Sequence, residues 1–226
     1  GAPEREVSLA VPTGNFGNIL AAWAARRMGL PIRQLCVGSN RNDILTRFLN
    51  ANDMTIKGVV PSLSPSMDIQ VSSNFERLLF ELLGRDAKRC AELMTGFRAS
   101  GHMDIPAETW ERARDLFSGL ALDDAQTEAA IRSVHQRSGY LADPHSVIGI
   151  EAGRRFRQPG IPMVAEATAH PAKFPDAMVA ATGIHPALPP HMADLFERRE
   201  RYRTVPATQD AIKDAVRAAL AGGNTD

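Results

Sequence analysis

The stretch from Val11 to Asn18, Val-Pro-Thr-Gly-Asn-Phe-Gly-Asn, constrains this chain most, because it joins an apolar lead-in to an alanine-rich helical run. Gly14 and Gly17 permit close backbone approach and unusual φ and ψ angles, and Asn18 can cap the following helix. A loop at a helix N-terminus presents several N–H donors and the positive end of the helix dipole to one point. The stretch therefore predicts an anion site, whose usual occupant is phosphate.

A plain strand-to-helix turn is the competing interpretation. The spacing of the two glycines matches neither the dinucleotide-binding fingerprint nor the Walker loop. On spacing alone, the phosphate site and the plain turn are about equally supported.

The charge balance excludes two classes of partner. The chain has 26 basic and 26 acidic residues among 226, so no basic field attracts nucleic acid or an anionic membrane. Apolar runs are too short to span a membrane, and the first residues lack the order of a signal peptide. Cys36 and Cys90 lie far apart and make no metal-binding spacing. We therefore expect a cytoplasmic protein with reduced thiols and no metal site.

The first half of the chain alternates between strand and helix patterns. Strands are predicted over 7–11 and 32–37, and helices over 18–28 and 42–50, the second one capped by Asn40 or Asn42. Short turns between such elements are typical of an α/β fold with a parallel sheet. A loop rich in serine, glycine and proline follows over 55–68, and an apolar stripe predicts a helix over 74–83.

The middle of the chain interrupts this alternation. Three helices are predicted, over 86–99, 106–120 and 123–137. A helix capped by His145 or Ser146, a strand over 163–168, and helices over 175–181 and 209–220 follow. We therefore expect an α/β segment over 1–85, a helical insertion over 86–137 and a second α/β segment over 138–226.

Several polar residues are candidates for a substrate pocket or for proton transfer. His145 and His170 could act as general bases, although satisfied structural histidines are commoner. Lys173 and Arg77 could meet a substrate phosphate, although each also fits a helix surface. Candidates for the pocket lining, with no role assigned to any one of them, are Ser64, Ser66, Asp68, Ser72, Ser73 and Asn74.

Five blocks, taken together and in this order, resemble the threonine synthase family. They are Pro-Thr-Gly-Asn-Phe-Gly-Asn at 12–18, Ser-Asn-Arg-Asn-Asp-Ile-Leu at 39–45, the segment 64–77, Asp-Pro-His-Ser at 143–146, and Ala-Thr-Ala-His-Pro-Ala-Lys-Phe at 167–174. The resemblance implies a tryptophan-synthase-β-like fold, that of fold-type-II pyridoxal-phosphate enzymes, with this chain forming most of the large domain. It also implies the conversion of O-phospho-L-homoserine and water into L-threonine and phosphate.

The resemblance assigns site residues by position in these blocks. The cofactor phosphate would be held by Gly14, Asn15, Phe16, Gly17 and Asn18. Thr168 matches the hydroxyl residue that faces the pyridine nitrogen in the family, where a neutral partner leaves that nitrogen unprotonated. Without the family, an ordinary strand-end hydroxyl is the better interpretation of Thr168. Apart from what the resemblance assigns, we expect substrate contacts from four of the candidates named above, Ser64, Asp68, Asn74 and Lys173.

The chain departs from the family in its lysines. It has Lys57, Lys88, Lys173 and Lys213, and none lies in the Schiff-base motif, which family members carry upstream of the phosphate loop. Because the cofactor chemistry needs that lysine, we expect no catalytic residue in this chain. The resemblance therefore implies a C-terminal portion that is inactive without its N-terminal partner segment.

Three alternatives remain. One is a threonine-synthase-like phospholyase, which eliminates phosphate from a related phospho-amino acid. Another is a non-catalytic module that binds pyridoxal phosphate or a similar anion. The third is an anion-binding α/β domain without the cofactor.

Overall fold

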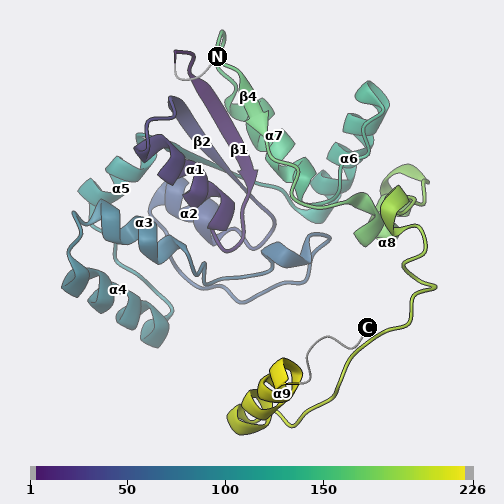
Figure 1. Cartoon of the computed structure of the whole chain (residues 1–226). Helices are drawn as coiled ribbons and strands as arrows, with labels where there is room; N and C mark the ends of the chain where they lie inside the picture. The colour runs from purple at the N-terminus through teal and green to yellow at the C-terminus, as the bar shows by residue number, and fades with distance from the viewer. Residues whose placement is uncertain (1–3, 222–226) are drawn as a thin grey trace. The chain divides into compact units, whose positions relative to one another are not determined.

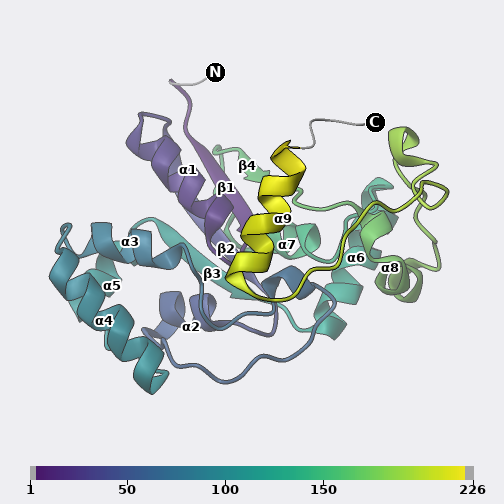
Figure 2. The same ribbon diagram turned by 60° about the horizontal axis from the view of Figure 1, so that its bottom comes forward.

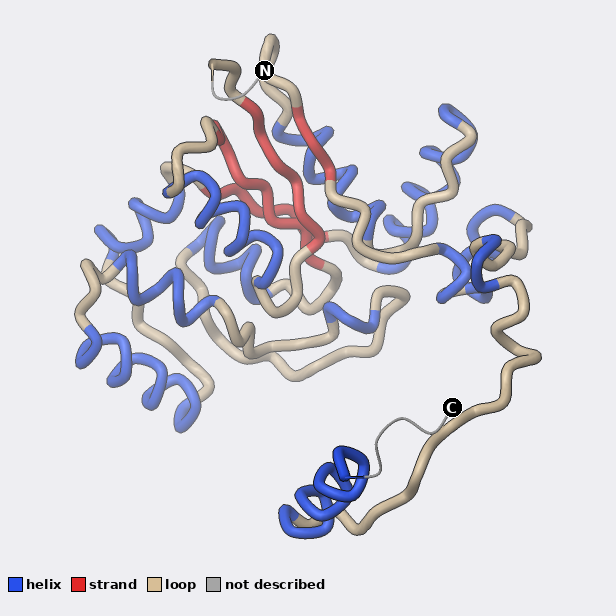
Figure 3. Tube along the Cα trace, in the orientation of Figure 1, coloured by secondary structure: helices blue, strands red, loops and turns tan. Residues whose placement is uncertain are grey.

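A four-stranded parallel sheet organises the molecule, in the computed structural model that describes residues 4–221. The strand order is β3-β2-β1-β4, and every neighbouring pair is parallel. Figure 3 shows these strands side by side with helices on both sides. The predicted α/β class with a parallel sheet is confirmed. The strands are β1 (Val7–Pro12), β2 (Ile32–Ser39), β3 (Phe117–Ala121) and β4 (Met163–Ala165).

Helices cover both faces of the sheet, as parallel sheets require. Alternate residues of β1 and β2 pack towards α1 (Gly17–Arg27) and α2 (Ile44–Ala51), where they form the larger core cluster. On the other face, Ala10 and Cys36 pack against Ala152 of α7 (Ser146–Phe156). Figure 1 shows these three helices flanking the strands.

Helix α7 lies unusually close to the sheet. A Cβ at Gly149 would lie 2.7 Å from Cδ of Pro12, so only glycine fits where α7 crosses the end of β1. A Cβ at Gly38 would similarly lie 2.9 Å from Cγ2 of Ile148. This close approach brings the start of α7 next to the loop that follows β1.

The remaining helices of residues 4–186 form two groups. In Figure 2, α3, α4 and α5 gather beside α1 and α2. Their bounds are Phe75–Leu82, Ala87–Ser100 and Ala107–Arg114. The other group is α6 (Asp124–Ser138) and α8 (Pro175–Thr182), which pack on each other and share an apolar cluster with α7. Two short 3-10 turns, Pro65–Met67 and Pro171–Lys173, complete this unit.

The predicted helix over 106–120 is wrong in its second half. The helix α5 ends at Arg114, and Phe117–Ala121 is the strand β3. Local pattern favoured helix, but five residues of this segment pair with β2. Gly119 also fits closely, since a Cβ there would lie 3.0 Å from Cα of Thr46. Tertiary pairing therefore overrides propensity, and a strand from the segment 86–137 joins the main sheet.

The predicted caps of α1 and α2 are wrong, because Phe16 is the N-cap of α1 and Asp43 that of α2, and neither side chain caps its helix. His145 is the N-cap of α7, as one of the two predictions had it, but its side chain makes no capping hydrogen bond. Strand β4 is shorter than predicted and ends at Ala165.

Residues 187–226 cluster as a second unit, separate from residues 1–186. Its described part contains the 3-10 turn Pro190–Met192 and the helix α9 (Gln209–Ala221), and Ile212, Val216 and Leu220 of α9 are exposed. The segment boundaries expected at residues 85 and 137 stay predictions. Among the helices of residues 4–221, none combines the length and apolar character that crossing a membrane would need.

Candidate anion and cofactor site

The loop after β1 presents a run of unused donors. Within residues 4–221, no acceptor receives a hydrogen bond from the backbone N–H groups of residues 14–19. The first intrahelical bond of α1 runs from Leu20 N to Phe16 O, at 3.1 Å. A helix ordinarily leaves its first few N–H groups without partners. Here the loop before α1 adds further N–H groups that have no acceptor. We call residues 14–19 the anion loop.

The unusual backbone angle falls on Phe16 and not on the glycines. Phe16 has φ 64° and ψ 16°, a left-handed conformation that is costly for a bulky residue. Its ring is 3% exposed and packs edge-on against Phe75, with centroids 5.8 Å apart. A second aromatic contact, with Phe117, has the same centroid distance. Core packing therefore stabilises the left-handed conformation of Phe16 at the start of α1.

Gly14 is required for a different reason. A Cβ there would lie 2.8 Å from the carbonyl oxygen of Ser66, too close for any side chain. Gly17 has ordinary space, since its Cβ would lie 3.8 Å from the Asn74 amide nitrogen. Close approach therefore explains Gly14, while nothing in the described residues prevents a side chain at Gly17.

Two adjoining hollows, of about 240 and 160 Å³, lie at the carboxyl end of β1. In open parallel sheets, ligands bind at this edge. The first is lined by the whole anion loop, and the second by Thr168 and Lys173 among others. They share Pro12, Gly14, Asn18 and Ser66. The structure thus brings the predicted residues Gly14 to Asn18 together with Thr168 and Lys173.

Thr168 is held through a buried pair at the start of α7. Its backbone N–H donates to Oγ of Ser146 at 3.0 Å, and that hydroxyl donates to Asp143. Asp143 also accepts from the backbone N–H of His145, at 2.8 Å. Burial raises the pKa of the Asp143 carboxyl, but the hydrogen bonds from His145 and Ser146 outweigh it and hold that pKa below its usual range. Sequence analysis missed this role, although an aspartate just before a helix start is a recognisable signal.

His145 supports the opposite side of the hollow. Its Nε2 accepts from the backbone N–H of Ser66 at 3.3 Å, and its Nδ1 lies 3.1 Å from Oδ1 of Asp143. These partners assign the proton to Nδ1. The lone pair that a general base would need is thereby engaged with Ser66. His170 accepts at Nδ1 from its own turn, at Ala172 N.

Glu166 is a second residue that the sequence did not single out. Its backbone N–H donates to Ala10 O at 2.9 Å, where β4 ends beside β1. Burial raises the pKa of its carboxyl, and a hydrogen bond with Asn18 of the anion loop offsets part of the rise. The available signal was its place two residues before Thr168 in an extended segment, which predicts the same face.

Ser64 and Asp68 lie in a separate hydrogen-bonded network. Oδ1 of Asp68 accepts from Asn40 at 2.7 Å, Asn42 at 2.9 Å and Ser62 at 2.6 Å. Ser64 is 1% exposed and accepts from Asn40. Neither residue lines the two hollows of the anion loop. Their contact with substrate stays a prediction, and in this structure they stabilise the loop after β2.

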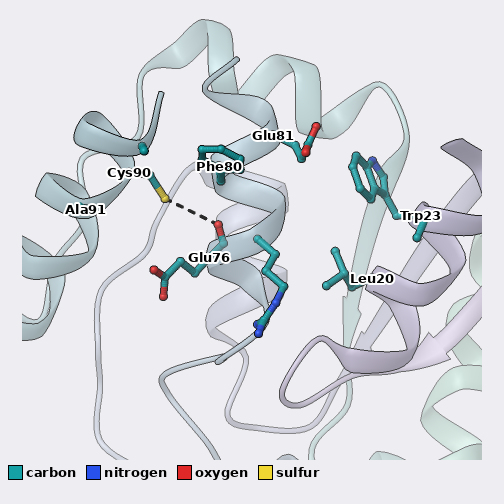
Figure 4. A pocket seen from close by; sticks show the side chains of 10 residues that line it. Leu20, Trp23, Glu76, Phe80, Glu81, Cys90 and Ala91 are labelled. Carbon is teal, nitrogen blue, oxygen red and sulfur yellow. Dashed lines mark hydrogen bonds between the residues drawn. The ribbon is translucent and has the colours of Figure 1, made fainter. Parts of the chain in front are cut away.

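A larger groove of about 660 Å³ lies between α1, α3 and α4. Figure 4 shows Leu20, Trp23 and Phe80 around it, with the Cys90 thiol donating to the Glu76 carbonyl. Of the residues predicted to bind cofactor or substrate, Arg77 alone lines this groove, and the groove shares no lining residue with the two hollows of the anion loop. It is therefore separate from the candidate site.

Comparisons with known proteins agree with this geometry. A family model described as threonine synthase, C-terminal, matches residues 146–216. Threonine synthase of Pseudomonas aeruginosa is 54% identical over 208 residues, which cover 91% of this chain and 44% of that protein. Threonine synthase of Corynebacterium glutamicum is 37% identical over 225 residues, covering 96% and 47%. The chain thus spans about half the length of these relatives.

Solved structures show the same likeness. The crystal structure of a PLP-bound threonine synthase from Brucella melitensis matches with a TM-score of 0.90 and 48% identity, over 96% of this chain and 47% of that one. Yeast threonine synthase matches with a TM-score of 0.84 and 30% identity, over 96% and 48%. The predicted tryptophan-synthase-β-like fold is confirmed. The chain belongs to the threonine synthase family, in which it matches the C-terminal portion of the members.

Proposed function

We propose that this chain is the cofactor-phosphate half of a threonine synthase, which converts O-phospho-L-homoserine and water into L-threonine and phosphate. The observation that carries the proposal is the anion loop. Its N–H groups lack acceptors in residues 4–221 and its residues line a hollow at the carboxyl end of β1, in a chain 54% identical to a threonine synthase. The cofactor would be pyridoxal 5′-phosphate, because a solved relative is PLP-bound.

The residues present fit this cofactor. Free N–H groups at the start of a helix match a phosphate dianion in charge and in hydrogen bonding. Thr168, which lines the second hollow, carries a neutral hydroxyl that would serve as the partner of the ring nitrogen. When bound, pyridoxal phosphate supplies an electron sink for carbanion chemistry. The anion loop would bind and orient it, and the Asp143–Ser146 pair would hold the backbone of Thr168 in place.

The reaction also needs a lysine that this chain does not place at the site. Of its four lysines, only Lys173 lines the hollows of the anion loop. Lys173 lies 5.7 Å from the ring centre of Phe174 on an exposed turn, where its charge would attract the substrate phosphate. We therefore propose that the Schiff-base lysine comes from the remaining half of the protein, and that this chain alone is inactive.

A reconstitution experiment tests both statements. The complete protein, given pyridoxal phosphate and O-phospho-L-homoserine, should release threonine and inorganic phosphate in equal amounts. Residues 1–226 alone, given the same mixture, should release neither. Turnover by the isolated chain would refute the proposal that the other half of the protein supplies the lysine. Failure of the complete protein to bind the cofactor would refute the proposed function.

A phospholyase related to threonine synthase is the second candidate. Human threonine synthase-like 1 is 32% identical over 233 residues, which cover 93% of this chain. Its identity is lower than that of the bacterial threonine synthases quoted above. Phosphate release without threonine, or faster release from other phospho-amino acids, would favour this candidate.

We also propose that the protein works in the cytoplasm. Both cysteines, Cys36 and Cys90, are buried free thiols, which suits a reducing compartment. Burial raises the pKa of Cys36 to about 12, so it stays protonated and unreactive. Cell fractionation followed by immunoblotting would test the location.

A further inference from the structure

Two carbonyl groups of the anion loop accept hydrogen bonds from residues outside α1. Oγ of Ser72 donates to the carbonyl oxygen of Gly14 at 2.9 Å. Asn74 donates twice to the carbonyl oxygen of Asn15, from its backbone N–H at 3.0 Å and from Nδ2 at 2.9 Å. Both donors lie just before α3, which begins at Phe75. The two loop carbonyls are therefore held by a neighbouring segment.

These two carbonyls are the ones that a longer α1 would use. In an α-helix the N–H of residue i bonds to the carbonyl of residue i−4. One more turn of α1 would therefore pair Asn18 N with Gly14 O, and Ile19 N with Asn15 O. Neither bond forms in the structure, whereas the next pair, Leu20 N with Phe16 O, does at 3.1 Å. Hydrogen bonding of α1 starts where the contacts from Ser72 and Asn74 end.

Side-chain contacts fix the same segment against the loop. The Arg77 guanidinium donates to Oδ1 of Asn74 at 2.8 Å, so the amide nitrogen of Asn74 must face Asn15. Phe75, next in sequence, packs edge-on against Phe16. Ser72 is 6% exposed, so its hydroxyl is largely shielded from solvent. The start of α3 thus holds both the carbonyls and the aromatic ring of the loop.

We propose that Ser72 and Asn74 are positioning residues for the anion that the loop 14–19 binds. They do not touch the anion. They hold the carbonyls of Gly14 and Asn15 away from α1, which keeps the N–H groups of Asn18 and Ile19 free to donate to a phosphate. This inference rests on the proposed function and assigns Asn74 to the loop, where the sequence suggested a substrate contact.

Two probes separate this role from general support of the fold. The complete protein is titrated with pyridoxal 5′-phosphate and with pyridoxal, which lacks the phosphate, and binding is followed by absorbance. Ser72→Ala and Asn74→Ala should each weaken the phosphate form about tenfold, the size of one charge-assisted hydrogen bond. Their affinity for pyridoxal should not change.

Ser73→Ala is the matched control. Ser73 is exposed, and within residues 4–221 its hydroxyl donates only to Oδ1 of Asn15, at 3.4 Å, and to no backbone carbonyl, so neither affinity should change. Asn74 is only half-buried, so its truncation leaves no closed cavity, and it keeps the inference testable if Ser72→Ala folds poorly. Equal losses for both probes, or an unchanged affinity for the phosphate form, would overturn the inference while leaving the proposed function intact. A wild-type protein that binds neither probe would overturn both.

Discussion

Two polar loops leave the same edge of the sheet and differ in one respect. The anion loop after β1, residues 14–19, keeps its N–H groups without acceptors in the described chain. The loop after β2, with Asn40 and Asn42, packs on residues 60–68 and satisfies its polar atoms internally. Asp68 alone accepts four hydrogen bonds there, from Asn40, from Asn42 and from the hydroxyl and N–H of Ser62.

We propose that this difference separates a binding loop from a structural one. Both loops are rich in asparagine and small residues, so composition does not distinguish them. Buried polar groups are normally paired, and a saturated network stabilises the fold without reaching a ligand. In contrast, a loop whose N–H donors lack acceptors beside a hollow can donate hydrogen bonds to a ligand. Four substitutions test this contrast.

The largest effect is expected at the buried carboxylate of Asp143, which holds Thr168 through Ser146. Asp143→Asn should lower the free energy of unfolding by about 3 kcal/mol at pH 7, because buried donors lose a charged acceptor. The folded-state pKa lies below the usual 3.8, so this stabilisation is present above pH 4 and is lost as the pH falls through the lowered value. Urea unfolding at pH 7 and at pH 3 measures both quantities.

Asp115 offers the control, because its carboxylate is exposed. Asp115→Asn should change the unfolding free energy little at either pH. If the Asp143 variant keeps wild-type stability at pH 7, the buried pair does not hold Thr168 as described.

Removing Asp68, the acceptor in the loop after β2, should lower the free energy of unfolding slightly less than Asp143→Asn does. Asp68→Ala leaves the Asn40 and Asn42 amides without an acceptor and should cost about 2 kcal/mol of stability. The affinity of the protein for pyridoxal phosphate should change less than twofold, since the Asp68 carboxylate does not line the hollows of the anion loop. Unfolding and cofactor titrations of one preparation give both values. A large loss of affinity with unchanged stability would reverse our assignment of the two loops.

Substitution in the anion loop should show the opposite pattern. Gly14→Ala places a Cβ 2.8 Å from the Ser66 carbonyl. The loop must shift, at a cost of about 1 kcal/mol in stability and about tenfold or more in phosphate affinity.

Gly17→Ala is the matched control for stability. Its Cβ has open space, and its φ is not positive, so unfolding free energy should stay level or rise by about 0.5 kcal/mol. Equal destabilisation by both alanines would show that close contact with Ser66 is not what requires Gly14.

The smallest effect is expected at the rim of the second hollow. Lys173→Gln removes an exposed charge, so it should raise KM for O-phospho-L-homoserine about threefold and leave the unfolding free energy unchanged. The rise should shrink as ionic strength increases. Steady-state assays at low and high salt check it, with exposed Lys88→Gln as control. A KM rise that is independent of salt would contradict an electrostatic role.

Local pattern predicted most elements but failed where long-range pairing decides. The strand–helix alternation of residues 7–50 and the helices α4 and α6 follow from apolar periodicity. The segment 117–121 read as helix, because nothing nearby in sequence shows that β2 needs a partner. The cap prediction for α1 failed for a similar reason. Asn18 was the predicted cap, yet Phe16 is the N-cap of α1, where aromatic contacts with Phe75 and Phe117 hold it.

The residues 12–18 by themselves predicted a loop between a strand and a helix, and their spacing supported an anion site and a plain turn about equally. Their resemblance to threonine synthase likewise rested on sequence alone. Only the tertiary structure decided which donors are free and which polar residues are occupied. Hydrogen-bond partners such as Ser72 with Gly14, or Asp68 with Asn40, lie 58 and 28 residues apart in the chain. Satisfaction of a polar group is a property of its neighbours in space, which no local pattern records.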